Sequence, residues 1–275
     1  MTRTFEADLS VDAARFDLRQ AVSALERCGC FIVRRALPRG VLQDMLDAVQ
    51  RGYEEMEDAY RSGALGDDVV RRNYGYGILR PFENDLRTAR GALLRDLMLG
   101  FVGASPLRDI VAGYLGASAT LLLEACHVRR QGPGQPGRPV PLHQDCSVMR
   151  MKRGRLLNFW VPLVDGAGRS SPGLEFFPRS LDRILDTPQR PAPASARERM
   201  YTNFEIPESD VRAALADVPS WRPVLDCGDV LCLDGWTVHR THFDAGMVEM
   251  RYGFETRLCR TSDLQPGMPG HFQAL

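Results

Sequence analysis

The sequence has no excess charge of either sign and no long apolar run. Lysine plus arginine and aspartate plus glutamate number 35 each, so no net field draws the chain to nucleic acid or to an anionic membrane. No stretch reaches the roughly 18 apolar residues of a membrane-spanning helix, and the opening MTRTFEADLS lacks the apolar core of a secretory signal. We therefore expect a cytoplasmic protein with no nucleic-acid or membrane partner.

Cysteine is present, but its pattern indicates neither a disulfide framework nor a zinc site. The seven cysteines are odd in number and scattered through apolar segments, which is typical of reduced, buried thiols. Apolar residues make up 44% of the 275 residues and charged residues 25%, as in soluble proteins with a sizeable core. A chain of this length is expected to form one domain over residues 1–275.

The chain changes character near Gly116. Before that point, apolar spacing predicts helices from Ser10 to Gly29, from Leu37 to Gly63, and over about 84–99 and 106–115, with the short strand CFIVRR after the first. After it, strand patterns dominate, from ASATLLLEACHVRR to EMRYGFETRL. The simplest arrangement is a mainly helical part over 1–117, packed on an antiparallel barrel or sandwich over 118–260, with a tail over 261–275.

The stretch VPLHQDCSV (140–148) has a histidine and an aspartate two residues apart in a run that otherwise reads as a β-strand. Because alternate residues of a strand share a face, His143 and Asp145 would converge on one point. Taken singly, they could be a core histidine and a turn residue. His239, which follows the Gly-Asp turn and the short strand VLCL, is the candidate for a third ligand, and His242 competes with it.

Two imidazoles and one carboxylate on one side of a metal, with the other side open, are what a non-haem Fe(II) oxygenase needs. The open positions accept an anionic co-substrate and O₂. A 2-oxo acid also needs a cation for its far carboxylate, and Arg251, twelve residues after His239, has the planar guanidinium for this. Arg257 competes for this role, although it shares a strand face with Glu255 and could simply pair with it.

With LHQD and GDVLCLDGWTVH, the set His143, Asp145, His239 and Arg251 resembles the phytanoyl-CoA dioxygenase-like family of Fe(II)/2-oxoglutarate oxygenases. The resemblance extends to LNFWVPLVDGAGRSSPGLEFFPRS and covers nearly the whole chain. It implies a mainly β fold with helical decoration, a double-stranded β-helix (jelly roll, cupin-like) with the N-terminal helices packed on the barrel. It also implies that the three metal ligands are the catalytic centre for Fe(II) and O₂, and that Arg251 binds 2-oxoglutarate.

Further co-substrate contacts follow less directly. The resemblance implies that Trp160 lies beside 2-oxoglutarate, that Thr241 supplies a hydroxyl, and that Arg129 replaces an upstream basic residue. Strand alternation in LLNFWVPL independently sends Asn158 and Trp160 to one face, where both could line a pocket. The alternatives are that Trp160 is ordinary core filler and that a register shift of one residue points Arg130 inward instead.

The resemblance implies hydroxylation of an unactivated C–H bond of a small-molecule metabolite, with release of succinate and CO₂. Asp145 favours oxygen insertion over halogenation, because halogenating relatives carry Gly or Ala at that position. Desaturation, cyclisation and epimerisation are alternatives with the same centre, and a catalytically silent binding protein or a zinc hydrolase are alternatives of another class. We expect a monomer or homodimer whose Gly/Pro-rich loop 131–141 closes over the substrate.

Overall fold

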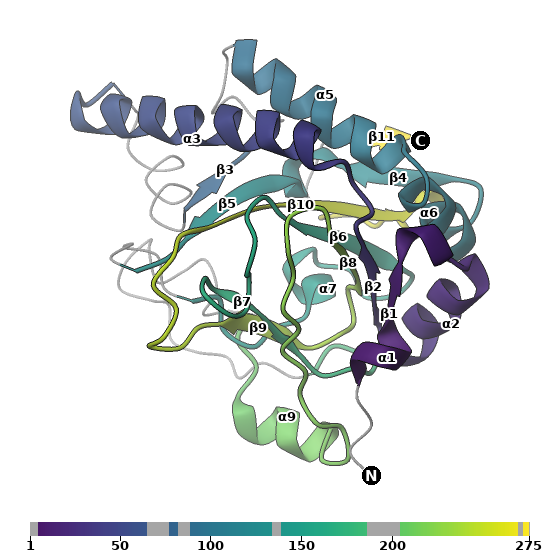
Figure 1. Cartoon of the computed structure of the whole chain (residues 1–275). Helices are drawn as coiled ribbons and strands as arrows, with labels where there is room; N and C mark the ends of the chain where they lie inside the picture. Colours follow the sequence, from purple (N-terminus) through teal and green to yellow (C-terminus); the bar gives the residue numbers. More distant parts are fainter. Residues whose placement is uncertain are drawn as a thin grey trace.

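Two β-sheets form the centre of the fold in the computed structural model (Figure 1). The structure describes residues 5–64, 77–81, 89–133, 139–185, 204–268 and 272–274. The large sheet has the strand order β1-β2-β8-β6-β10-β4-β11, with β5 also paired to β10 and β3 paired to β5. Its strands are β1 (Ser10–Asp12), β2 (Cys30–Arg34), β3 (Ile78–Leu79), β4 (Ala119–Leu122), β5 (His127–Gln131), β6 (Leu156–Pro162), β8 (Val230–Asp234), β10 (Arg251–Arg260) and β11 (Phe272–Ala274).

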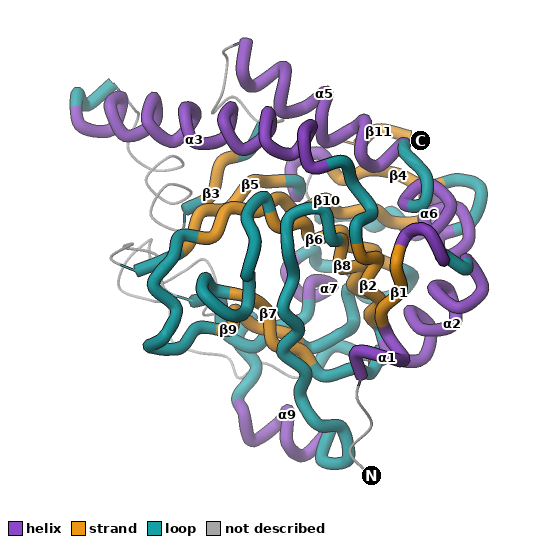
Figure 2. Tube along the Cα trace, in the orientation of Figure 1, coloured by secondary structure: helices purple, strands orange, loops and turns teal. Residues whose placement is uncertain are grey.

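The small sheet pairs β7 (Gly173–Phe176) with β9 (His239–His242) in antiparallel register. Helices lie around this β-centre, as the purple and orange segments of Figure 2 show. Helix α6 contacts β4, β6 and β10, α2 contacts β2 and β8, and α3 packs along α5. The helices are α1 (Phe5–Leu9), α2 (Leu18–Cys28), α3 (Arg39–Arg61), α5 (Ala89–Gly103), α6 (Leu107–Leu115), α7 (Asp145–Val148) and α9 (Glu208–Ala214).

The two faces of the large sheet differ in chemistry. On β6, Leu157, Phe159 and Val161 are fully buried and join one apolar cluster with Leu42 and Met45 of α3. The residues between them on β6 face the other way, because side chains alternate along a strand. The helical side of the sheet is therefore the dry core, and its opposite face is available for a polar site.

The two ends of α2 confirm one sequence signal and correct another. Gly29 ends the helix with φ 67°, and a Cβ there would lie 1.9 Å from the Thr237 hydroxyl oxygen, so glycine meets both requirements. The predicted cap Ser10 is wrong: it begins β1 and pairs with Ile32. The observed cap is Asp17, whose carboxylate accepts the first free backbone N–H groups of α2.

Other boundaries also differ from the predicted ones. The predicted strand over 117–130 is broken by a 3-10 turn at Leu123–Ala125, which separates β4 from β5. The predicted tail contributes β11, which pairs with β4. The mainly helical part contributes β1 and β3 to the large sheet, in addition to the predicted strand CFIVRR, which is β2. Helix α5 extends to Gly103, and residues 84–88 of its predicted span lie outside the described residues. The additional strands form by pairing with segments that are distant in the sequence, and a local sequence pattern does not contain that information.

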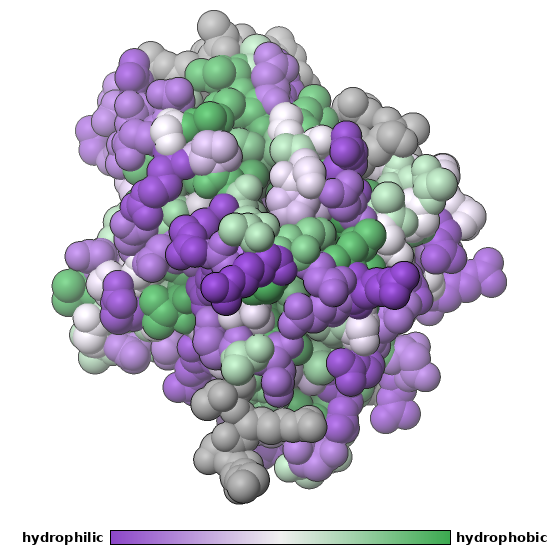
Figure 3. Space-filling view, turned by 45° about the vertical axis from the view of Figure 1, so that its right-hand side comes forward, coloured by the Kyte–Doolittle hydropathy of each residue, from purple (hydrophilic) through white to green (hydrophobic). Residues whose placement is uncertain are grey.

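Hydrophilic and hydrophobic side chains both contribute to the surface. Figure 3 shows hydrophilic residues over most of one face, with hydrophobic residues in smaller groups between them. Across the residues that the structure describes, no helix is both long and apolar enough to cross a membrane. None of the seven cysteines forms a disulfide, and five of them are buried.

Asp234 makes the stability of the fold depend on pH. Burial raises its pKa to about 6, despite the hydrogen bond from Ser180, so the folded protein holds this proton more tightly than the unfolded chain. Stability is therefore lost as pH rises from about 4 to about 6, at about 1.4 kcal/mol for each pH step of one across this range. Asparagine does not titrate, so the free energy of unfolding of Asp234→Asn, relative to that of the wild type, should rise by about 2 kcal/mol between pH 4.5 and pH 7.5. Urea unfolding of both proteins across this range measures the difference. Unfolding free energies that change with pH in parallel would contradict this.

Candidate metal centre

Three potential metal ligands meet between the small sheet and the start of α7. His143 and His239 exchange two backbone hydrogen bonds of 3.0 Å each, and their ring centroids lie 4.2 Å apart. Asp145, the first residue of α7, completes the group, in which one ligand atom from each residue lies within 4.8 Å of the others. All three residues are buried. Folding thus unites residues that are up to 96 positions apart in the sequence.

The predicted strand over 140–148 is wrong, although its two polar residues do converge. His143 lies in an isolated bridge, and the chain then turns into α7 rather than continuing as a strand. The turn is fixed by the buried amide of Gln144, which donates to the carbonyls of Trp236 at 2.7 Å and Arg183 at 3.0 Å. Sequence reasoning missed Gln144, because a glutamine between two polar residues carries no distinguishing pattern.

Both imidazoles are oriented by backbone carbonyls. Nδ1 of His143 lies 2.8 Å from the Pro141 oxygen, and Nδ1 of His239 lies 3.0 Å from the Thr237 oxygen. Because a carbonyl only accepts, each Nδ1 carries the proton and each Nε2 keeps a lone pair, the arrangement of metal-binding histidines. Burial, together with the neighbouring His239, lowers the pKa of His143 to about 3. His143 is therefore neutral near pH 7, as a ligand must be.

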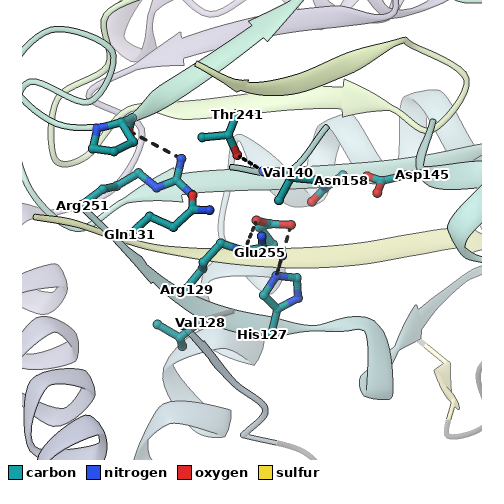
Figure 4. Close-up of polar contacts among 12 residues, drawn as sticks. His127, Val128, Arg129, Gln131, Val140, Asp145, Asn158, Thr241, Arg251 and Glu255 are labelled. Atoms are coloured by element: carbon teal, nitrogen blue, oxygen red, sulfur yellow. Dashed lines mark hydrogen bonds and ion pairs between the residues drawn. The ribbon is translucent and has the colours of Figure 1, made fainter. Parts of the chain in front are cut away.

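The carboxylate of Asp145 is held by one donor on each oxygen. Nδ2 of Asn158 donates to Oδ2 at 3.0 Å, and Nη2 of Arg257 donates to Oδ1 at 2.9 Å. Burial by itself raises the pKa of Asp145, but Arg257 and the two imidazoles outweigh it and keep that pKa below its ordinary value. The acid is therefore ionised and fixed in place. Figure 4 shows Asn158 and Asp145 as neighbours.

Arg251 lies at the other end of the same cavity. Figure 4 shows Arg251 beside Gln131. Its guanidinium is fully buried, donates to the side-chain oxygen of Gln131 and to the carbonyl of Gly173 at 3.3 Å, and lies 5.2 Å from the ring of Trp160. The hydroxyl of Thr241 accepts the backbone N–H of Val140 at 3.1 Å in the cavity wall. Stacking and hydrogen bonds thus orient the planar fork of Arg251 before any ligand arrives.

The cavity floor is built from alternate residues of neighbouring strands. On β5, His127, Arg129 and Gln131 share one face, and on β10, Glu255 pairs in register with His127 on one side and with Trp160 on the other. Arg129 forms an ion pair with Glu255 at 3.8 Å, which a dashed line marks in Figure 4. Sequence reasoning missed Gln131 and His127, although the alternation in HVRRQ could have indicated them.

Several competing assignments are separated by the geometry. Arg129 lines the cavity, whereas Arg130 points away from it and lies 4.4 Å over the ring of Tyr53. His242 lies outside the ligand group, 3.8 Å from Asp244. Arg257 pairs with Glu255, one of the two roles that the sequence allowed, and in addition with Asp145. Residues 134–138 of the predicted closing loop lie outside the described residues.

A single cavity connects these groups. Its volume is about 190 Å³, and Ile78, Arg80 and Met149 are among the residues that line it. All eight side chains predicted to form the site line it: His143, Asp145, His239, Arg251, Trp160, Thr241, Arg129 and Asn158. The arrangement provides a pocket with ligand atoms at one end, a cation at the other and mixed apolar and polar walls between them, which is typical of a small-molecule site.

The sequence matches no family model and no curated protein, but the fold is similar to many solved structures. One is the non-heme alpha ketoglutarate dependent carbocyclase SnoK from nogalamycin biosynthesis, with 15% identity and a TM-score of 0.64 over 97% of this chain and 99% of that chain. Another is the epimerase SnoN in complex with Fe3+, alpha ketoglutarate and nogalamycin RO, with 18% identity and a TM-score of 0.57 over 92% of each chain.

A third is EctD from S. alaskensis with 2-oxoglutarate and 5-hydroxyectoine, with 16% identity and a TM-score of 0.56 over 90% of this chain and 77% of that chain. At these identities the similarity establishes the fold. The predicted fold class is therefore confirmed: the chain is mainly β, with helices packed on a jelly roll similar to that of these structures.

Proposed function

We propose that the protein is an Fe(II)- and 2-oxoglutarate-dependent dioxygenase that hydroxylates an unactivated C–H bond of a small molecule. The observation that carries the proposal is the joint placement of His143, Asp145 and His239 at one end of a buried cavity and Arg251 at the other. Two of the similar solved structures support it, because SnoK and SnoN are non-heme alpha ketoglutarate dependent enzymes of a similar fold.

The residues fit a divalent iron ion. Two imidazoles whose Nδ1 atoms are engaged by backbone carbonyls, together with one ionised carboxylate, form a donor set of the kind that non-haem iron prefers. When bound, the iron supplies a Lewis-acidic centre with free positions for the 2-oxo acid group and O₂. His143, Asp145 and His239 hold it, and Arg251 holds the far carboxylate of 2-oxoglutarate with two parallel hydrogen bonds.

The protein's own contribution is to position the co-substrate and to exclude water from the cavity. Trp160 stacks against Arg251 and narrows the space for the co-substrate, while Leu174 and Val140 supply apolar walls that exclude water. Thr241 and Arg129 present polar groups towards the same space. In this proposal the substrate lies beside Met149, which also lines the cavity. Cyclisation, epimerisation and desaturation are alternative outcomes, since the ligand set is common to them and the neighbours include a carbocyclase and an epimerase.

Within this class, the residue pattern around LHQD favours the phytanoyl-CoA dioxygenase-like family. We further propose a single cytoplasmic domain acting on a small-molecule metabolite, as a monomer or homodimer. The retention of a complete ligand set together with an oriented arginine argues against a silent binding protein. Arg251 would also have no role in a zinc hydrolase.

The test is the iron dependence of 2-oxoglutarate turnover. We expect succinate to form when purified protein is given Fe(II), ascorbate, 2-oxoglutarate and O₂, at a slow rate without substrate and faster with one from a metabolite panel. A chelator should abolish succinate formation and added Fe(II) should restore it, because the two imidazoles and the carboxylate are not redox-active without the metal. Binding of 2-oxoglutarate without succinate would support a silent binding protein, and hydrolysis restored by Zn²⁺ alone would support the hydrolase.

A further inference from the structure

The hydrogen bonds of Asp145 come from a cross-strand pair. Arg257 on β10 and Asn158 on β6 are register partners, and each donates to a different oxygen of the Asp145 carboxylate, at 2.9 Å and 3.0 Å. Both oxygens of the carboxylate are therefore hydrogen-bonded to side chains of the large sheet. Neither donor is a metal ligand, and Asn158 was expected from the sequence to face the co-substrate instead.

Arg257 is itself held on its far side. Its Nη2 also donates to Glu255 at 3.0 Å, and its Nη1 donates to the carbonyl of Ala125 at 2.8 Å. Glu255 lies two residues earlier on the same strand face, 3.4 Å from His127 and 3.8 Å from Arg129. The guanidinium thus has fixed partners on both sides and cannot swing away from Asp145 without breaking them.

The cluster is also balanced in charge. Asp145 and Glu255 supply two negative charges, and Arg129 and Arg257 supply two positive charges, while burial lowers the pKa of His127 and keeps it neutral. All five residues are at least nine-tenths buried. A buried charge without a partner of opposite sign is strongly destabilising. Because the charges within this cluster already balance, the cluster does not need a bound ion to be stable. The charge of a bound ion then remains available to attract anionic ligands.

We propose that the Glu255–Arg257 pair is a positioning device that fixes the Asp145 carboxylate so that it offers only one oxygen to the metal. The inference rests on the proposed metal centre. With Arg257 bound to Oδ1 and Asn158 bound to Oδ2, the carboxylate cannot turn both oxygens towards the ion. A second carboxylate oxygen would occupy one of the positions that the co-substrate and O₂ require, so Arg257 protects the open side of the centre.

The test uses Co(II) bound in place of iron, because its visible absorption reports the number and symmetry of its ligands and needs no turnover. We expect Arg257→Met to change this spectrum relative to the wild type. Glu255→Gln is expected to change it in the same direction but less, because Arg257 keeps its bonds to Asp145 and Ala125. Arg260→Met is the matched control: Arg260 is on the same strand, bonds the carbonyl of Leu115, and should leave the spectrum unchanged.

A charge-balanced double variant separates positioning from a merely structural role. If Arg257 only neutralises buried charge, Arg257→Met/Glu255→Gln restores the wild-type Co(II) spectrum, and the proposal is overturned. If Arg257 positions Asp145, the double variant recovers thermal stability but keeps the altered spectrum, with turnover about 10- to 100-fold below wild type. Arg257→Lys provides a second single variant in case the methionine variant does not fold, since lysine keeps the charge but loses the fork.

The outcomes also separate this inference from the proposed function. A wild-type protein that binds Co(II) and shows no change on Arg257→Met or Arg257→Lys contradicts the positioning role alone. A wild-type protein that binds Co(II) but forms no succinate contradicts the oxygenase proposal and leaves the spectral test of Arg257 intact. A wild-type protein that binds no Co(II) at all overturns both.

Discussion

Replacement of His239 by alanine is expected to abolish iron binding and to lower 2-oxoglutarate turnover by more than about a hundredfold, beyond the effect of losing a residue that only supports a ligand. The reason is geometric: a ring nitrogen of His239 is one of three ligand atoms gathered within 4.8 Å, and two remaining ligands do not hold Fe(II) in a facial arrangement. Calorimetric titration with Fe(II) measures iron binding, and succinate formation measures 2-oxoglutarate turnover.

His242→Ala is the matched control for this variant. His242 lies on the same strand, three residues further, but outside the ligand group and beside Asp244. It should bind iron and turn over 2-oxoglutarate like the wild type. Equal losses in the two variants, or iron binding retained in His239→Ala, would contradict the assignment of the third ligand.

Replacement of Arg251 by methionine is expected to raise the KM for 2-oxoglutarate by about a hundredfold, the equivalent of about 3 kcal/mol from two charge-assisted hydrogen bonds. Methionine keeps much of the apolar contact with Trp160 but cannot bind a carboxylate. Iron binding should be unchanged, because Arg251 belongs to the opposite end of the cavity from the ligand group. Initial rates of succinate formation at varied 2-oxoglutarate measure the effect.

Arg251→Lys sharpens this test, because lysine keeps the positive charge but loses the planar fork. We expect an intermediate KM. A KM that is unchanged in both variants would mean that another cation, such as Arg129, holds the co-substrate. Parallel loss of iron binding would mean that Arg251 supports the fold rather than the ligand.

The parts of the site on regular strands could be predicted from the sequence. Asn158 and Trp160 share a face because the residues between them are apolar and strands alternate. The same rule places Arg251, Glu255 and Arg257 together on β10, and the structure has them so. Strand alternation is local, and for this reason a single sequence contains it.

The remaining features depend on contacts between distant segments. Asp145 reaches the ligand group from the first turn of a helix, held there by the amide of Gln144, and no local pattern distinguishes this from a strand. The bond from Arg257 to Asp145 joins residues 112 positions apart. Alternation predicted that Arg257 shares a face with Glu255, but the element opposite that face is set by the packing of α7 against the sheet.

In the proposed centre, two imidazoles and one carboxylate surround a common ion and leave its other side open towards Arg251. This arrangement can be examined in a crystal of the protein soaked anaerobically with Fe(II) and 2-oxoglutarate. We expect an anomalous iron peak at about 2.0–2.2 Å from the Nε2 atoms of His143 and His239 and from one oxygen of Asp145, with the far carboxylate of 2-oxoglutarate on Arg251. Iron bound elsewhere, or its open side filled by protein side chains, would contradict it.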